Sequence, residues 1–272
     1  SRQATPVERR LEEIARATPG FVGADIENLV NEAAILAARR NKKIIERPEF
    51  EESIERVIAG PERKSRLINP REKRIIAYHE AGHAVVINAL PEGDPVQKVS
   101  IISRGMMGGF TRALPTEDLS LESRKKLFAN MVSMLGGRAA EEIMFDDITS
   151  GASSDIERVT KLARSMVTRL GMSEKLGPMV YGQKEEMVFL GREISEQRDY
   201  SEAVAQEIDR EVQSAVSEAY KTAKEILEKY KDKLIAVAER LLEVETISNK
   251  EFEAIFPPPV EKNQGIPAII AE

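Results

Sequence analysis

The sequence predicts a mainly α-helical protein, with a small helical unit followed by a larger helix-rich domain that carries a small β hairpin or sheet. Apolar residues recur at helical spacing through most of the chain, and two short runs between residues 96 and 114 are typical of strands. Tryptophan is absent and aromatic residues make up 5% of the 272 residues, so we expect an aliphatic core. Hydrophobic residues (42%) are sufficient for such a core, and charged residues (32%) indicate a strongly charged surface.

The first unit, residues 1–60, is expected to contain three helices. A short amphipathic helix covers Val7–Ala17. A stronger helix covers Gly23–Arg40, because its apolar residues fall on one side. Pro48 stands at the start of a third helix that ends near Ala59, since proline is favoured in the first helical turn.

The larger domain, residues 70–256, follows a charged linker at residues 61–69. Its first helix, Asn69–Leu90, has strong start signals: Asn69 as the N-cap and Pro70 at the first helical position. After it we expect two strands, five helices and a flexible tail: Val96–Ile102, Gly109–Leu114, Leu119–Phe145 with a candidate break at Gly136–Gly137, Ser153–Leu170, two helices between Tyr200 and Glu245 that part near Tyr230, a capped helix from Ser248, and the tail 257–272.

The segment His79–His83, with the sequence HEAGH, lies inside that first helix and holds both histidines of the chain. Two histidines four residues apart on a helix project from one face, so both rings can reach one metal ion. Glu80 can then reach a metal-bound water and take its proton. A chance match is expected in roughly one chain of this length in a hundred. The motif therefore favours a zinc-hydrolase site.

The third metal ligand is less clear from the residues. A catalytic zinc usually takes three protein ligands and keeps one position open for water. The chain has no third histidine and no cysteine, so the remaining ligand must be Asp or Glu. Spacing leaves two places, the Glu141–Glu142 pair within a helix and Asp155 at a helix start. Asp155 could equally be a helix cap, and composition does not choose between them.

Charge and composition exclude several other classes. The net charge of −6 is spread over interspersed residues of both signs, which argues against a nucleic-acid surface. The absence of cysteine rules out disulfides and thiolate metal sites, and it fits a reducing compartment. No apolar run approaches the length of a membrane span and no signal peptide is evident, so this stretch is expected to be soluble.

The segment Ala17–Ala34, ATPGFVGADIENLVNEAA, resembles the lid subdomain of AAA+ ATPases. It is most similar to the lid of the FtsH family of membrane-anchored, ATP-dependent zinc metalloproteases. There the Gly-Ala-Asp segment opens the helix that closes over the nucleotide, so the resemblance implies that Gly23 and Ala24 lie nearest to it. No Gly-x-x-x-x-Gly-Lys-[Ser/Thr] phosphate loop occurs in the chain. ATP and Mg²⁺ are therefore expected only in the full-length protein, and this chain alone is not expected to hydrolyse ATP.

Two further segments match the same family. Gly136–Glu142 matches its Gly-Gly-Arg-x-Ala-Glu-Glu segment, and Gly151–Ile156 matches Gly-Ala-x-x-Asp-[Ile/Leu]. The family places an aspartate ligand in the second of these segments, so the resemblance implies Asp155 as the third zinc ligand. Glu141 is implied only as a residue that orients a ligand. The implied architecture is a helical AAA+ lid subdomain followed by a zinc-protease domain.

The resemblance also implies an activity. It is that of a zinc-dependent endopeptidase, part of an ATP-dependent protease that degrades unfolded membrane and soluble proteins, with Glu80 as the general base. Polypeptide substrates are expected to lie extended along an edge strand at Gly108–Leu114. The resemblance implies a homo-hexamer and a parent protein with a membrane anchor outside this chain, at the cytoplasmic face of the bacterial inner membrane or its organelle equivalent. Two alternatives remain: a non-catalytic hexamerisation module with a structural zinc, and an oligomerisation scaffold without metal.

Overall fold

The computed structural model of the chain describes residues 20–60, 69–103, 108–113, 121–182 and 199–258, together with 11, 14, 15, 17 and 18. Within them the protein is mainly helical and has one small antiparallel sheet, which confirms the predicted fold class. Three predicted segments lie wholly or largely outside the described residues, namely the helix at 7–17, the linker at 61–69 and the tail at 257–272.

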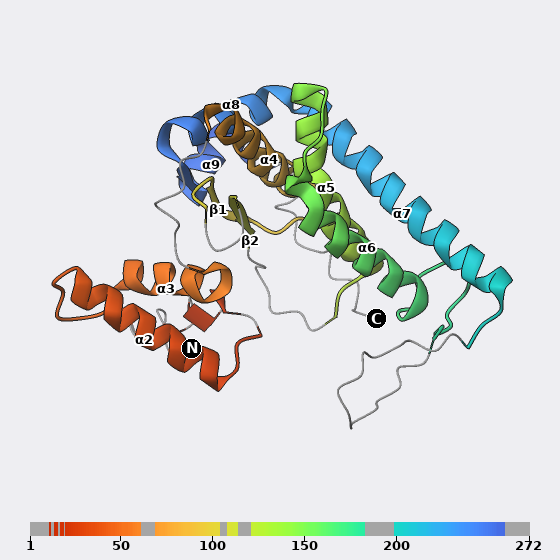
Figure 1. The fold of residues 1–272 in the computed structure, drawn as a ribbon, viewed down its shortest axis with the longest axis horizontal. Coiled ribbons are helices and arrows are strands. Elements are labelled where there is room, and N and C mark those ends of the chain that lie inside the picture. The colour runs from red at the N-terminus through yellow and green to blue at the C-terminus, as the bar shows by residue number, and fades with distance from the viewer. Residues whose placement is uncertain are drawn as a thin grey trace, which may run out of the picture.

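In the described residues the first unit contains α2 (Gly23–Arg39) and α3 (Arg47–Ala59), and residues 11, 14, 15 and 17 before them are also helical. The two helices pack on each other, and Figure 1 shows them set apart from the remaining helices. Asp25 caps α2 and Glu49 caps α3, because each carboxylate accepts a hydrogen bond from the backbone N–H three residues before it. Pro48 lies in the first turn of α3, as predicted.

Helix α4 (Pro70–Ala89) occupies the centre of the larger domain, against α5 (Arg124–Phe145) and α8 (Lys231–Val244). Its predicted start is confirmed, since the Asn69 side chain accepts a hydrogen bond from the backbone N–H of Arg71 at 2.9 Å. Small buried residues allow its neighbours to come close on several sides: Ala77, Ala81, Gly82 and Ala84. The HEAGH segment is therefore held within the core.

Helix α5 differs from its prediction at two points. It begins at Arg124, later than expected, because Ser123 caps it by accepting a hydrogen bond from Lys126 N at 3.1 Å. It also runs through Gly136–Gly137 without the expected break. A Cβ atom placed on Gly136 would lie 2.8 Å from the backbone oxygen of Gly82. The glycine is thus needed for the close contact between α4 and α5 and does not end a helix.

The sheet has the strand order β2-β1-β3, with β1 at Val96–Ser100, β2 at Phe110–Ala113 and β3 at Thr246–Ser248. Both pairings are antiparallel, and the β1–β2 pair confirms the expected hairpin. Strand β3 was not predicted, because three residues between two helices are too short for a recognisable alternation. Among the described strands, β2 has a partner on one side only.

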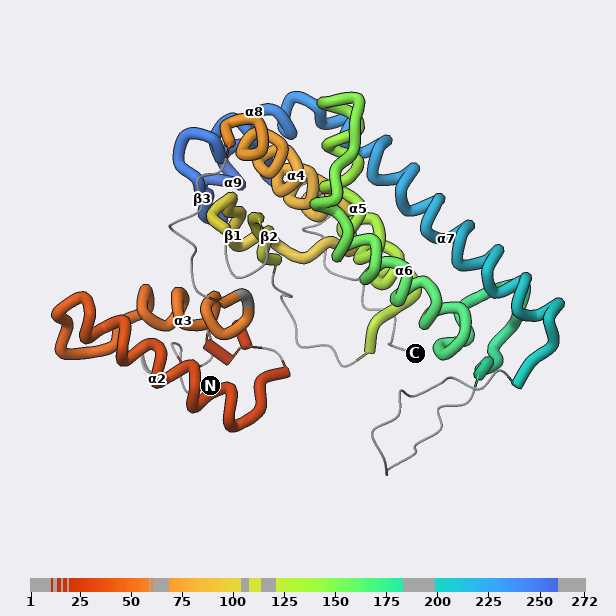
Figure 2. Tube along the Cα trace, viewed as in Figure 1, coloured from red at the N-terminus to blue at the C-terminus, as the bar shows by residue number. Residues whose placement is uncertain are grey.

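The remaining helices enclose this centre. Tyr230 separates α7 from α8, which confirms the break predicted near that residue. Figure 2 shows α7 running alongside α5 and α6. The bounds of these elements are Ser150–Ala152 for the 3-10 turn η1, Ser153–Thr168 for α6, Glu202–Lys229 for α7 and Asn249–Ile255 for α9. None of the described helices has the length and apolar character needed to cross a bilayer.

Candidate metal centre

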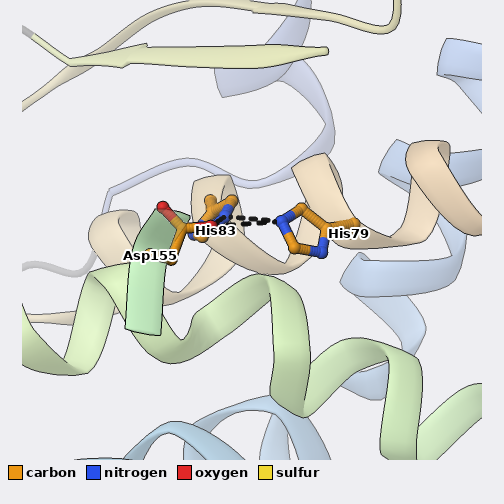
Figure 3. A group of neighbouring side chains, drawn as sticks. All are labelled: His79, His83 and Asp155. Carbon is orange, nitrogen blue, oxygen red and sulfur yellow. Dashed lines mark hydrogen bonds and ion pairs between the residues drawn. The ribbon is translucent and has the colours of Figure 1, made fainter. Parts of the chain in front are cut away.

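Three polar side chains meet where α4 lies against α5 and the start of α6 (Figure 3). His79 and His83 project from α4 one turn apart, and Asp155 comes from the first turn of α6. The two Nε2 atoms are 3.0 Å apart. The Asp155 Oδ2 atom lies 3.5 Å from Nε2 of His79 and 3.4 Å from Nε2 of His83. The structure thus brings together the three residues named from the sequence as metal ligands.

The triangle of donor atoms has the size that a zinc ion requires. A tetrahedral zinc with ligands at about 2.0–2.1 Å sets neighbouring donor atoms about 3.3 Å apart. The three separations of 3.0, 3.4 and 3.5 Å bracket that value. Among the described residues, no other group of three histidine or acidic side chains converges in this way. Two imidazoles and one carboxylate also make a donor set typical of catalytic zinc.

Each imidazole is oriented by a hydrogen bond on its far side. Nδ1 of His79 donates to Glu141 Oε1 at 2.6 Å, and Nδ1 of His83 donates to the backbone oxygen of Ser133 at 2.8 Å. Protonation at Nδ1 leaves the lone pair of Nε2 directed at the site. Glu141 is itself fixed, because its Oε2 atom accepts a hydrogen bond from the backbone N–H of Thr149 at 2.7 Å.

The structure distinguishes among the three acidic residues that the sequence left as candidates for the third metal ligand. Glu141 lies against the outer nitrogen of His79, on the side away from Asp155. Glu142 points elsewhere, since it accepts a hydrogen bond from the Tyr220 hydroxyl and pairs with Lys224. Asp155 does not cap α6, because no side-chain hydrogen bond caps this helix and the Asp155 carboxylate lies at the two histidines instead.

Gly137 brings α5 directly against the His79 ring. A Cβ atom at this position would lie 2.6 Å from Cδ2 of His79 and closer still to its Nε2 atom. Any larger residue must therefore displace the ring. The Gly136–Gly137 pair serves two contacts: the first glycine accommodates the backbone of α4, and the second accommodates a side chain of the candidate site.

Glu80 lies beneath strand β2 and is almost completely buried. Its Oε2 atom accepts a hydrogen bond from the Thr111 hydroxyl at 2.9 Å. Burial raises the pKa of the Glu80 carboxyl, while the adjacent histidines oppose that shift. Neither the contact with Thr111 nor the Ser133 carbonyl had any signal in the sequence, because both depend on how distant segments pack.

The charges of the site favour a cation. Burial lowers the pKa of His79, but the carboxylates of Asp155 and Glu141 outweigh it and raise that pKa to about 10. Burial likewise raises the pKa of Asp155, and the two imidazoles outweigh it and hold that pKa well below its usual range. A proton and a metal ion compete for the same nitrogen lone pair. The carboxylates that stabilise a proton on His79 therefore also favour a divalent metal.

Gly23 and Ala24, the residues named for nucleotide binding, lie on the first helical unit. Both are exposed at the start of α2. A Cβ atom added to Gly23 would meet nothing within 4 Å. This exposed helix start is open to a ligand, but no contact in the described residues assigns one.

Comparison with known proteins divides the chain into the same two parts, the first helical unit and the larger domain. Residues 66–255 match peptidase family M41, and residues 9–52 match the AAA+ lid domain. ATP-dependent zinc metalloprotease FtsH 1 of Sphaerobacter thermophilus is 59% identical over 254 residues, which cover 93% of this chain and 39% of that protein. ATP-dependent zinc metalloprotease FtsH of Thermotoga maritima is 57% identical over 253 residues, which cover 93% of this chain and 42% of that protein. The chain spans about two fifths of the length of these curated relatives. It belongs to peptidase family M41.

Proposed function

We propose that the chain is the zinc-dependent endopeptidase part of an ATP-dependent protease. Zinc is held by His79, His83 and Asp155, and Glu80 is the general base. The observation that carries this proposal is the triangle of donor atoms, with separations of 3.0, 3.4 and 3.5 Å, whose two histidines flank Glu80 on α4. Relatives at 57–59% identity that are named ATP-dependent zinc metalloproteases support it.

Zinc, when bound, supplies a Lewis acid that polarises the scissile carbonyl and lowers the pKa of water to about 7. The chain supplies the rest of the chemistry. Glu80 accepts the proton of the attacking water and later passes it to the leaving amine. Glu141 and the Ser133 carbonyl hold the two imidazoles in the tautomer that leaves each Nε2 atom free.

The substrate is an unfolded polypeptide that lies extended along the edge strand at Gly108–Leu114. Main-chain hydrogen bonds to an edge strand bind a peptide with little selection among side chains. Two features support this position: β2 has one described strand partner, and it lies over Glu80 through Thr111. Leu114 itself is outside the described residues.

The wider setting is also a proposal. We assign residues 1–60 to the lid, 61–69 to a linker, 70–256 to the protease domain and 257–272 to a tail. The two family matches, at 9–52 and 66–255, support this division. In the full-length protein ATP and Mg²⁺ bind next to Gly23 and Ala24 of the lid. The protein assembles as a homo-hexamer that is anchored at the cytoplasmic face of a bacterial inner membrane or its organelle equivalent, and it degrades membrane and soluble proteins.

A non-catalytic module with a structural zinc fits the site less well. Structural zinc sites are usually closed by four protein ligands, often with cysteine. In the described residues three donors converge, which leaves one position open. A buried carboxylate beside that open position would then have no role. These features favour catalysis over a purely structural metal.

The test compares Glu80→Gln with Glu142→Gln, a control on α5 whose carboxylate contacts Tyr220 and Lys224. Each purified variant is assayed for zinc content and for casein cleavage, before and after a chelator and after zinc is restored. We expect Glu80→Gln to keep one zinc per chain and lose most cleavage, while Glu142→Gln retains both. Full turnover in Glu80→Gln would contradict the assignment. Bound zinc without chelator-sensitive cleavage in the wild type would favour the structural alternative.

A further inference from the structure

Strand β2 and the residue just before it, Gly109, lie against Glu80. Residues two apart in extended backbone face the same side, so Gly109 and Thr111 both face α4. The Thr111 hydroxyl lies 2.9 Å from Oε2 of Glu80 and 3.1 Å from its backbone oxygen. A Cβ atom placed on Gly109 would lie 2.8 Å from Cγ of Glu80. Gly109 therefore lies close to the middle of this side chain, and Thr111 contacts its carboxylate.

The Thr111 hydroxyl is well suited to fix a carboxylate. A hydroxyl has one proton to donate, and both acceptor oxygens within reach belong to Glu80. Threonine is stiff at its first side-chain torsion because it is branched at Cβ. Its backbone is fixed as well, since Thr111 pairs across the sheet with Val99, which is fully buried. This rigid donor thus restricts the rotation of the Glu80 side chain, which otherwise turns about three bonds.

We propose that Thr111 is a positioning residue that holds the Glu80 carboxylate in the orientation needed for proton transfer. This inference rests on the proposed role of Glu80 as the general base and extends it. Strand β2, along which the substrate is proposed to lie, then also fixes the orientation of the Glu80 carboxylate. A peptide that pairs with β2 is then placed relative to Glu80 through one rigid element, which is how a catalytic group gains its advantage from orientation.

The test replaces the hydroxyl without changing the shape of the side chain. Thr111→Val removes the donor, Thr111→Ser restores it, and Thr246→Val is the matched control. Thr246 lies in β3 of the same sheet, where its hydroxyl bonds to Ser100 at 2.8 Å and not to Glu80. For each variant kcat and KM are measured on a casein-derived peptide, together with zinc content and the midpoint of thermal unfolding.

We expect Thr111→Val to lower kcat by about tenfold or more, because a hydrogen bond to a charged group is lost. KM should stay within about twofold, because the backbone of β2 that pairs with a peptide is unchanged. Thr111→Ser should recover most of kcat. Zinc content should not change, and the unfolding midpoint should fall no further than in Thr246→Val. If Thr111→Val does not fold, Thr111→Ala replaces it with the same expected loss of kcat.

Unchanged kcat without the hydroxyl would overturn the inference. So would a loss that Thr111→Ser fails to restore, an equal loss of kcat in Thr246→Val, or a rise in KM alone, which would assign Thr111 to substrate binding. The Glu80→Gln variant separates this failure from that of the proposed function. If Glu80→Gln is inactive and Thr111→Val is fully active, only the role of Thr111 is wrong. If Glu80→Gln is active, the general base itself is wrongly assigned.

Discussion

The metal centre and the first helical unit are held together in different ways. At the metal centre, glycines let backbone meet backbone and side chain: Gly136 meets Gly82, and Gly137 meets the His79 ring. In the first unit, α2 and α3 share a small apolar core that includes Leu29 and Ile54, and ion pairs join the buried Glu49 carboxylate of α3 to the segment that follows α2. A close-packed glycine cannot be replaced by a larger residue without moving its neighbours, whereas an ion pair can be weakened gradually, for example by protonation of its carboxylate.

The difference fits the role proposed for each region. A zinc site works only if its ligands stay within a fraction of an ångström, so it is built on close-packed helices. The first unit, which matches the AAA+ lid domain, has no such set of ligands among its described residues. Its central carboxylate is paired with Arg40 at 2.7 Å and with Lys42 at 3.0 Å, and both cations are partly exposed. Substitutions should therefore have abrupt effects in the first region and graded effects in the second.

The largest effect is expected from Gly137→Ala. The added Cβ atom would displace the His79 ring, so zinc affinity should fall at least about a hundredfold, since even the loss of a ligand's outer partner costs about ten- to a hundredfold. Cleavage should be lost with the metal. The matched control is Gly23→Ala in α2, where a Cβ atom meets nothing within 4 Å and zinc affinity should not change. Zinc affinity is measured for both variants by competition with a chelator. An affinity of Gly137→Ala equal to that of wild type would show that α5 does not need a glycine beside the His79 ring.

A smaller effect is expected from Glu141→Gln. The variant keeps the shape of the side chain but removes the negative charge that faces Nδ1 of His79. Zinc affinity should fall by about ten- to a hundredfold, while the fold is retained. Glu142→Gln, one residue further along α5, should leave affinity unchanged. The same chelator competition measures both variants, and an unaltered affinity in Glu141→Gln would show that Glu141 does not orient the ligand.

The smallest effect is expected in the first unit, where lowering the pH should reduce the stabilisation provided by Glu49. Hydrogen bonds from Arg40 and Lys42 lower the pKa of Glu49 from its usual 4.5 to about 2, and burial opposes this shift. A lowered pKa stabilises the fold above the unfolded pKa, and that contribution disappears as the pH falls through the folded pKa. Wild type should therefore unfold at a higher temperature than Glu49→Gln at pH 7, and the gap should shrink between pH 4.5 and 2.

The control for this prediction is Glu51→Gln, because Glu51 forms an exposed ion pair with Arg47. Exposed pairs of this kind contribute little to stability. Its unfolding midpoint should therefore stay close to that of wild type at every pH. A constant gap between wild type and Glu49→Gln across the acid range would show that the ionised carboxylate does not stabilise the unit.

Local signals in the sequence were sufficient for much of the fold. The Asn69 cap, the break at Tyr230 and the HEAGH segment each depend on neighbours within a few residues. Asp155 was different, because an aspartate at a helix start is as typical of a cap as of a ligand. Its selection as the third ligand came from resemblance to a family and not from spacing.

Contacts between distant segments could not be predicted. Gly136–Gly137 was a candidate break because the physical reason for the two glycines, the close approach of α4, lies elsewhere in the chain. The Ser133 carbonyl is a group that every residue has, so no residue type marks it as a partner of His83. Thr111 lies on a strand whose place over Glu80 depends on the whole sheet.

We propose that Asp155 completes a zinc site with His79 and His83. Asp155→Asn tests it most directly, because it keeps the size of the side chain and removes its charge. Asp147→Asn, on the exposed segment between α5 and α6, is the control. Zinc stoichiometry and affinity are measured for both variants and for the wild type. We expect one zinc per chain in wild type and Asp147→Asn, and a loss of at least about tenfold in zinc affinity in Asp155→Asn. Wild-type affinity in Asp155→Asn would contradict it.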